Sequence, residues 1–322
     1  MDLLARILVA VDGSSPSEAA VRLALRLAAP RHDMVSFVSV FERDELIGLY
    51  GADGLSVSSL PEALSAAETR CESALDGATA AAAIAGVDAA TVLRTGIAVD
   101  SIVDEARAWN ASCIVVGTHG HGGLARAFLG SVAEGVLRKS PVPVLVGHAG
   151  QPDATRPIDR ILCAVDGSPA SRAAFDAAVS LARAWNVELY LLSVVQVADE
   201  YASAYEVEQF DPDGSMHAIY ADARFAVKAL AGEASARGAR VEPHTVGGSD
   251  VAERIVQSAR MWNCGLVVLG THGRGGVRRA IVGSVAEAVL RSSTIPGLVF
   301  RDPSDDAATL DPLREAAFTG TA

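Results

Sequence analysis

The chain consists of two copies of one sequence pattern, and this duplication restricts its fold more than any other feature. The segment RILVAVDGSS at 6–15 recurs as RILCAVDGSP at 160–169, an offset of 154 (160 − 6). A glycine-rich segment, GTHGHGGLARAFLGS at 117–131, recurs as GTHGRGGVRRAIVGS at 270–284, an offset of 153 (270 − 117). Because the copies are collinear, the sequence predicts two domains of the same fold.

Each copy alternates short β-rich runs with longer alanine-rich stretches. This alternation predicts an α/β fold, in which two similar doubly wound domains each have a parallel sheet with helices on both faces. The strands are expected near 6–11, 34–41, 89–95, 112–117 and 142–147, then near 160–165, 187–195, 240–246, 265–270 and 295–300. The helices are expected near 15–29, 60–85, 99–110 and 130–140, then near 168–185, 216–238, 250–263 and 283–293.

Glycine, proline and polar residues at 147–157 mark a linker between the two copies. We therefore predict domains at 1–150 and 151–305, followed by an acidic tail at 306–322. The 322 residues are enough for two hydrophobic cores. The net charge of -12 argues against a nucleic-acid binder or a membrane-surface protein, because both need a basic surface.

The four cysteines, Cys71, Cys113, Cys163 and Cys264, form no Cys-x-x-Cys pair. We interpret them as small buried apolar residues in a reducing compartment. The N-terminus has no export signal, and no apolar run is long enough to span a membrane. A cytoplasmic location is therefore expected.

The glycine-rich segment has a chemically informative position in each copy. An apolar run at 114–116 or 266–269 leads into it, and Ser131 and Ser284 at its end are each followed three residues later by glutamate. This Ser-x-x-Glu pattern predicts a capping box at a helix start. A strand, a glycine loop and a helix N-terminus in succession gather backbone N–H groups and a positive dipole, which favour a phosphate.

The first strand of each copy ends in Val-Asp-Gly-Ser, which places Asp12 and Asp166 at a strand end. Ligands of open α/β sheets bind at the carboxyl ends of strands, so these aspartates are expected to face the glycine loops. They would bond a ribose or base, or hold a magnesium ion that bridges phosphates. The alternative is that they only shape the turn into the next helix. We favour the ligand role, because neighbouring serines supply the helix caps.

Cationic side chains in the loops have two interpretations. They are solvated loop residues, or some of them neutralise phosphate charge, as arginine does through paired hydrogen bonds. Arg126 and Arg279 are the stronger candidates, and no cysteine or carboxylate lies at zinc-ligand spacing from the histidines. The residues concerned are His119, His121, Arg126, His272, Arg274, Arg278 and Arg279.

Several enzyme motifs are missing from the chain. The loops lack the lysine of a P-loop, the first strands lack Gly-x-Gly-x-x-Gly, and no Gly-x-Ser-x-Gly elbow is found. No general base is evident for fast hydrolysis. The sequence thus predicts a phosphate-binding protein more readily than a catalyst.

At these residues the chain resembles the universal stress protein family in its tandem two-domain form. ATP-binding members carry Gly-x2-Gly-x9-Gly-Ser/Thr, and both copies match this motif in full. The matching residues are Gly117, Gly120, Gly130 and Ser131, then Gly270, Gly273, Gly283 and Ser284. The resemblance extends from Arg6 to about Phe300 and includes both strand-end aspartates.

The resemblance implies a five-stranded parallel sheet of order 3-2-1-4-5 in each domain, with ATP across the ends of strands one and four. It places adenine near Asp12 and Val40, or near Asp166 and Val194. The implied nucleotide contacts of the first domain are Asp12, Gly13, Val40, Gly117, Thr118, His119, Gly120, Gly122, Arg126, Gly130, Ser131 and Val132. Those of the second are Asp166, Gly167, Val194, Gly270, Thr271, His272, Gly273, Gly275, Arg279, Gly283, Ser284 and Val285.

Family members commonly dimerise through their fifth strands, which implies a pseudo-dimer within this chain and further pairing of two chains. Gly297 weakens the second fifth strand and puts equivalent pairing in doubt. The connections at 42–59 and 196–215 differ wholly between the copies. They are lids or variable surface.

The leading hypothesis is a stress-response protein that binds ATP with Mg²⁺ and passes nucleotide occupancy to an unknown regulatory partner, with slow or no hydrolysis. The first alternative is a slow ATPase or nucleotidyl-transferring enzyme of the same architecture. The second is a structural interaction protein whose loops no longer bind nucleotide.

Overall fold

The computed structural model describes residues 4–52, 59–118, 129–148, 158–198, 215–271 and 283–301. The first half contains β1 (Arg6–Ala10), α1 (Ser15–Ala28), the short 3₁₀ helix η1 (Ala29–Arg31), β2 (Met34–Phe41), α2 (Arg43–Ala52), α3 (Leu60–Ala85), β3 (Ala89–Thr95), α4 (Ala98–Ala108), β4 (Cys113–Gly117), α5 (Ser131–Lys139) and β5 (Val144–Gly147). The second contains β6 (Arg160–Ala164), α6 (Pro169–Trp185), β7 (Glu188–Gln196), α8 (Ser215–Ala236), β8 (Arg240–Gly248), α9 (Val251–Met261), β9 (Leu266–Gly270), α10 (Ser284–Ser292) and β10 (Gly297–Phe300).

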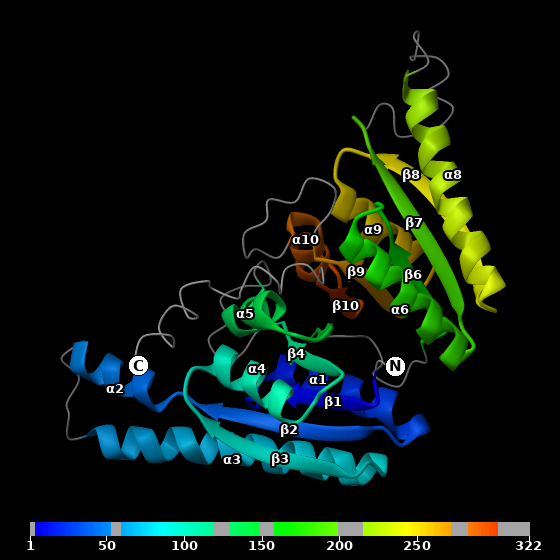
Figure 1. Ribbon diagram of the computed structural model, residues 1–322. Coiled ribbons are helices and arrows are strands. Elements are labelled where there is room, and N and C mark those ends of the chain that lie inside the picture. The colour runs from blue at the N-terminus through cyan, green and yellow to red at the C-terminus, as the bar shows by residue number, and fades with distance from the viewer. Residues whose placement is uncertain are drawn as a thin grey trace, which may run out of the picture.

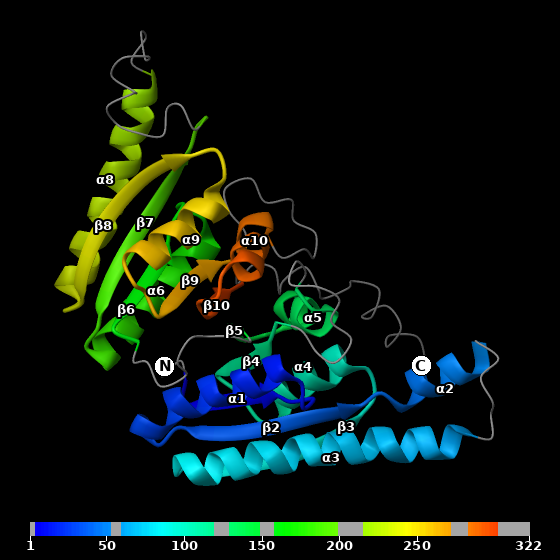
Figure 2. The ribbon, with the colours of Figure 1, turned by 180° about the vertical axis from the view of Figure 1, so that it is seen from behind.

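The strands form one continuous sheet in the order β3-β2-β1-β4-β5-β10-β9-β6-β7-β8. Neighbouring strands are parallel within each half, and β5 and β10 pair antiparallel at the centre. Each half therefore has the order 3-2-1-4-5 in its own strands, which is the order that the resemblance implies. The predicted α/β class is confirmed, and Figures 1 and 2 show the two halves meeting along β5 and β10.

Two hydrophobic layers run along the sheet, one on each face. Buried residues of α1, α3, α6 and α8 belong to one layer, and those of α4, α5, α9 and α10 belong to the other. Both layers include residues from both halves. The halves are thus covered on the same face by equivalent helices, as a pseudo-twofold axis perpendicular to the sheet requires.

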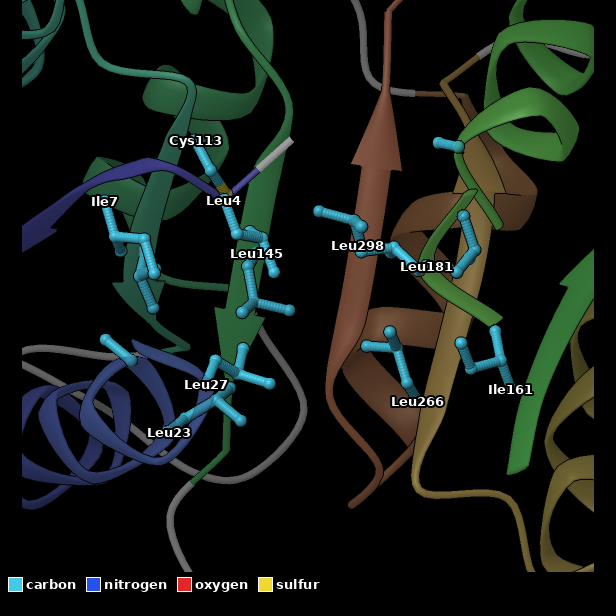
Figure 3. Packing of buried hydrophobic residues seen from close by; sticks show 14 of the residues in the cluster. Leu4, Ile7, Leu23, Leu27, Cys113, Leu145, Ile161, Leu181, Leu266 and Leu298 are labelled. Carbon is cyan, nitrogen blue, oxygen red and sulfur yellow. The ribbon is translucent and has the colours of Figure 1, made fainter. Parts of the chain in front are cut away.

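The central pairing joins Gly297 to Val146, Leu298 to Leu145 and Val299 to Val144. Figure 3 shows Leu145 and Leu298 on these facing strands, and both side chains are buried. Gly297 does not prevent the pairing that the sequence put in doubt. A Cβ atom there would lie 2.3 Å from Cδ2 of Leu290, so the glycine allows α10 to pack closely on β10.

Strands and helices are present at every predicted location, with two additions. Helix α2 occupies part of the connection after β2, and η1 extends the end of α1. The linker from 149 and the predicted tail at 306–322 lie outside the described residues. In the part of the chain that the structure describes, no helix has both the length and the apolar character needed to cross a bilayer.

Candidate functional site

A cleft of about 680 Å³ opens at the carboxyl ends of the first-half strands. It lies beyond β1, β2 and β4 and reaches the start of α5, which is where open α/β sheets bind ligands. The structure brings together many of the predicted contacts there. Its lining includes Asp12, Val40, Gly117, Thr118, Gly130, Ser131 and Val132.

Asp12 lies in the turn between β1 and α1 and also borders the cleft. Its Oδ1 atom accepts hydrogen bonds from Ser14 N at 2.9 Å and from Ser14 Oγ at 2.6 Å. Gly13 has a φ of 76°, a left-handed conformation that glycine adopts without strain. Ser14 is the N-cap of α1 and accepts from Ser17 N. The turn role that competed with the ligand role is therefore present, and the ligand role stays a prediction.

The second half repeats this turn. Asp166 Oδ1 accepts a hydrogen bond from Ser168 N at 3.0 Å, and Ser168 caps α6 by accepting from Ser171 N. Gly167 has a φ of 82°. The repeated geometry shows that Asp-Gly-Ser encodes a particular strand-to-helix turn as well as a candidate contact.

The first glycine of each loop has a structural role that differs from the predicted one. A Cβ atom at Gly117 would lie 2.6 Å from the carbonyl carbon of Pro16, and one at Gly270 would lie 2.6 Å from that of Ala170. Such distances are incompatible with a side chain. At these positions the close approach is made by the first turn of α1 or α6, whereas the sequence pattern suggested approach by a ligand.

The two ends of the glycine loop meet in a backbone hydrogen bond. Gly130 N donates to Thr118 O at 2.5 Å, and Thr118 N donates to the carbonyl of Gly147 at 3.0 Å. In the second half Gly283 N donates to Thr271 O at 2.7 Å, and Thr271 N donates to Phe300 O at 2.7 Å. These bonds hold the start of the helix that follows each loop, α5 or α10, against the end of the fifth strand. We call α5 and α10 the loop helices.

The predicted capping boxes at Ser131 and Ser284 are wrong. The N-caps are Gly130 and Gly283, neither helix start has a side-chain cap hydrogen bond, and the serines are the first helical residues. The Gly130 and Gly283 N–H groups donate to the carbonyls of Thr118 and Thr271, and their predicted contact with a phosphate stays a prediction.

The first three N–H groups of each loop helix are the remaining donors, because an α-helix offers them no internal acceptor. In α5 they belong to Ser131, Val132 and Ala133, all of which line the cleft. In α10 the first two belong to Ser284 and Val285, which are both exposed. Together with the helix dipole, these donors form a positive end that favours an anion.

The end of β2 forms the other side of the cleft. Val40 lines it, and its carbonyl accepts a hydrogen bond from the thiol of Cys71 in α3 at 3.6 Å. The equivalent Val194 is partly buried at the end of β7 and pairs with Val246. The structure therefore places both valines at second-strand ends, as predicted.

The sequence left the connection at 42–59 as a lid or variable surface, and it gave no sign that α3 would join it along one wall of the cleft. The polar residues of this wall are Glu42 just before α2, Glu45 in α2, and Arg70 and Cys71 in α3. Glu42 Oε1 accepts a hydrogen bond from Ala98 N, so it also caps the start of α4. No sequence pattern pointed to this wall, because nothing in the sequence distinguishes the half-buried Cys71 from the three buried cysteines.

The cysteines follow the prediction in three of four cases. Cys113, Cys163 and Cys264 are buried and unpaired, whereas Cys71 is half-buried at the cleft. Burial raises the pKa of the Cys113 thiol to about 12 and that of Cys264 to about 12, and it raises that of Cys163 well above the usual range. These three thiols remain protonated at neutral pH.

Several predicted contacts lie outside the described residues. They are the loop residues His119, Gly120, His121, Gly122 and Arg126 and their counterparts His272, Gly273, Arg274, Gly275, Arg278 and Arg279. Among the described residues, no three His, Cys, Asp or Glu side chains gather as a metal cluster.

The fold and the strand-end site define a doubly wound α/β protein with a duplicated domain. A model of the universal stress protein family matches residues 4–148 and again residues 157–301. The chain therefore belongs to the universal stress protein family, in tandem form, and its role lies in the stress response.

Individual relatives agree with this placement. A universal stress protein from Mycolicibacterium smegmatis is 30% identical over 302 residues, which are 92% of this chain and 96% of that protein. Universal stress protein Rv2005c from Mycobacterium tuberculosis is 33% identical over 195 residues, 59% of this chain and 62% of that protein. The crystal structure of a universal stress protein from Archaeoglobus fulgidus matches with a TM-score of 0.67 at 21% identity, covering 92% of this chain and 96% of that one. This last match supports the fold.

Proposed function

We propose that the chain is a regulatory ATP-binding protein of the stress response, with one nucleotide site in each half. The observation that carries the proposal is the start of the loop helices. In both halves this start has no side-chain cap and is held by a backbone bond at the strand ends. In the first half it faces a cleft large enough for a nucleotide.

Within the first cleft, the triphosphate would bind the N–H groups of Ser131 and Val132, and the adenosine would lie between Asp12 and Val40. Among the described residues that line the cleft, the carboxylates Asp12, Glu42 and Glu45 oppose one cation, Arg70. This acidic side suits the hydroxyls of a ribose better than a phosphate. Mg²⁺ would neutralise phosphate charge while needing few protein ligands. Bound nucleotide would then bias the conformation or the binding of a regulatory protein partner.

Isothermal titration calorimetry with ATP and Mg²⁺ tests the proposal. We expect two ATP molecules per chain. Ser131→Asp with Ser284→Asp should weaken binding at least about tenfold at each site, since a charge about 4 Å from a phosphate costs about 4 kcal/mol at an effective dielectric of 20. Aspartate suits a helix N-terminus, so the fold should persist.

Ser131→Asn with Ser284→Asn is the matched control, because it changes the shape equally without adding charge. Wild-type protein that binds no ATP at millimolar concentration, or aspartate variants that bind as well as the asparagine variants, would contradict the proposal. Comparison with cAMP, which carries a single cyclic phosphate, measures how much the triphosphate contributes.

Hydrolysis separates the regulatory proposal from the enzyme alternative. The Asp12 carboxylate is tied into its turn by two hydrogen bonds from Ser14, which does not favour a role as a general base. We expect single-turnover hydrolysis far below about 1 per second, the low end of ordinary enzyme rates. Turnover at that rate or faster would establish the enzyme alternative instead.

A further inference from the structure

Besides the backbone pairing of β5 with β10, side chains at two equivalent positions after these strands form hydrogen bonds between the halves. His148 follows β5, and its Nε2 donates to Leu290 O in the last turn of α10 at 2.5 Å. Arg301 follows β10, and its guanidinium donates to Ser140 O at the C-cap of α5 at 2.9 Å. Each half therefore supplies one side chain to the C-terminal end of the other half's loop helix.

These contacts have a clear physical basis. The last carbonyls of a helix lack internal donors, and the negative end of the helix dipole favours cationic side chains. His148 is 6% exposed, so its bond is shielded from water. A buried serine orders the turn after each helix, since Val142 N donates to Ser140 Oγ and Ile295 N donates to Ser293 Oγ. The helix ends are thus held in defined positions.

The same two residues are directly linked to the glycine loops of their own halves. The residue before His148 is Gly147, whose carbonyl accepts from Thr118 N at the start of the first loop. The residue before Arg301 is Phe300, whose carbonyl accepts from Thr271 N at the start of the second loop. One end of each fifth strand therefore touches its own loop and the opposite loop helix.

Helices α5 and α10 complete the connection. Each has nine residues and is about 13 Å long at 1.5 Å per residue. Its N-terminus lies at its own loop, and its C-terminus lies at the residue that adjoins the other loop. The contacts therefore form a route from Ser131 through α5 and Arg301 to Thr271, and an equivalent route passes through α10 and His148.

We propose that His148 and Arg301 are positioning residues that couple the two nucleotide sites. The inference rests on the proposed ATP sites. Ordering of one loop helix by ATP fixes the strand end that supports the other loop, so the second ATP encounters a site already ordered. Binding is therefore positively cooperative, and each site gains affinity by the same factor when the other is occupied.

The test measures ATP binding to full-length protein by calorimetry with both sites intact. Wild-type protein should bind its second ATP about fivefold more tightly than its first, the lower range of ordinary coupling, and Arg301→Ala or His148→Ala should remove most of that difference. Arg301→Lys and His148→Gln, which keep a donor, should recover most of the cooperativity. In Ser284→Asp, which retains only the first site, and in Ser131→Asp, which retains only the second, both alanine substitutions should leave the affinity for ATP within about twofold.

A role in stability alone predicts a different result. It lowers the unfolding midpoint of each variant but leaves the cooperativity of ATP binding unchanged. Non-cooperative binding by wild-type protein, or wild-type cooperativity in both alanine variants, would overturn the coupling while leaving the ATP sites intact. Wild-type protein that binds no ATP would instead contradict the proposed function, and the coupling would fail with it.

Discussion

The two halves share the backbone hydrogen bonds at the two ends of the glycine loop and differ in the side chains at the end of the second strand. In the first half this strand end borders an open cleft with Arg70 and Cys71. In the second half Val195, Val197 and Tyr220 pack together at the equivalent place. Gly86 follows α3 and Gly238 follows α8, and both have a left-handed conformation. When the two helices are aligned on these glycines, Ala223 of α8 occupies the position of Cys71 in α3.

A second difference lies one strand further out. Val40 pairs with Arg94, whereas Val194 pairs with Val246. Arg94 Nε donates to Glu105 Oε2 at 2.8 Å, and Ser258 occupies the place of Glu105 in α9. The halves thus keep one geometry where a phosphate would bind and have diverged where a base would bind, so the two sites are expected to differ in base recognition.

Replacing Arg94 should produce the largest change. Arg94→Val leaves the carboxylate of Glu105, which is 5% exposed, without its cation. We expect the free energy of unfolding to fall by about 3 kcal/mol, the low end for a broken buried pair, because the arginine is half exposed. Urea unfolding measures this loss.

The control introduces at both positions the residues that the second half has there. Arg94→Val with Glu105→Ser should regain stability to within about 1 kcal/mol of wild type, because no buried charge remains. A double variant as unstable as Arg94→Val would show that the two halves are not interchangeable at this position.

The shared geometry can be broken at the first loop glycine. Gly117→Ala and Gly270→Ala force a methyl group against the backbone of the first turn of α1 and α6 respectively, and each should lower the free energy of unfolding by about 2 kcal/mol. Equal losses are expected, because the two contacts are equally close. A loss at one glycine only would show that the turns differ in rigidity.

Matched controls exist in the long helices of each half. Gly77 in α3 and Gly232 in α8 have no heavy atom within 4 Å of an added Cβ. Alanine at either should raise the free energy of unfolding by up to about 1 kcal/mol, because it favours the helix.

A smaller difference concerns the caps of α4 and α9. Helix α4 begins after Ile97, which gives no side-chain cap, and Glu42 supplies the acceptor, whereas Asp250 caps α9 directly. Glu42→Ala and Asp250→Ala should each cost about 1 kcal/mol in urea unfolding. Ile97→Asp should rescue Glu42→Ala but leave Asp250→Ala unchanged, and rescue of both would argue against a local effect.

The smallest expected effect concerns chemical labelling of the cysteine thiols, which should not change the stability of the protein. At pH 8 a maleimide should modify one thiol per native chain, at Cys71, because burial keeps Cys113, Cys163 and Cys264 protonated and inaccessible. Intact-mass spectrometry counts the adducts, and denatured protein should carry four. A native chain of Cys71→Ala that still takes up a label would contradict the assignment.

The elements with strong hydrophobic periodicity were predictable from sequence, and two features were not. Helix α2 escaped prediction because its apolar residues bury little surface: Leu46 and Leu49 line the open cleft, and Ile47 is exposed. The joining of two sheets into one was implied by the family resemblance, but no local pattern encodes it, because it depends on Leu145 meeting Leu298 in a distant segment.

At the candidate site, the motif located the right segments and misassigned some of their roles. Ser-x-x-Glu suggested serine caps, but the bond from Gly130 N to Thr118 O fixes an extended conformation that makes the glycine the cap. A glycine is required at position 117 because the first turn of α1 packs against it. The sequence alone cannot show whether a packed helix or a bound ligand imposes that requirement. The wall from α2 and α3 depends on tertiary packing alone.

The pairing of β5 with β10 also affects how the chain is made. Strand β5 ends at Gly147, but its partner begins at Gly297, so 150 residues (297 − 147) must be added before the two can meet. At 5–20 residues per second, this interval lasts about 10 to 30 s on the ribosome. During that time a folded first half presents an unpaired strand edge, and edges of this kind favour aggregation or pairing with another chain. The brevity of β5, at four residues, limits that exposure.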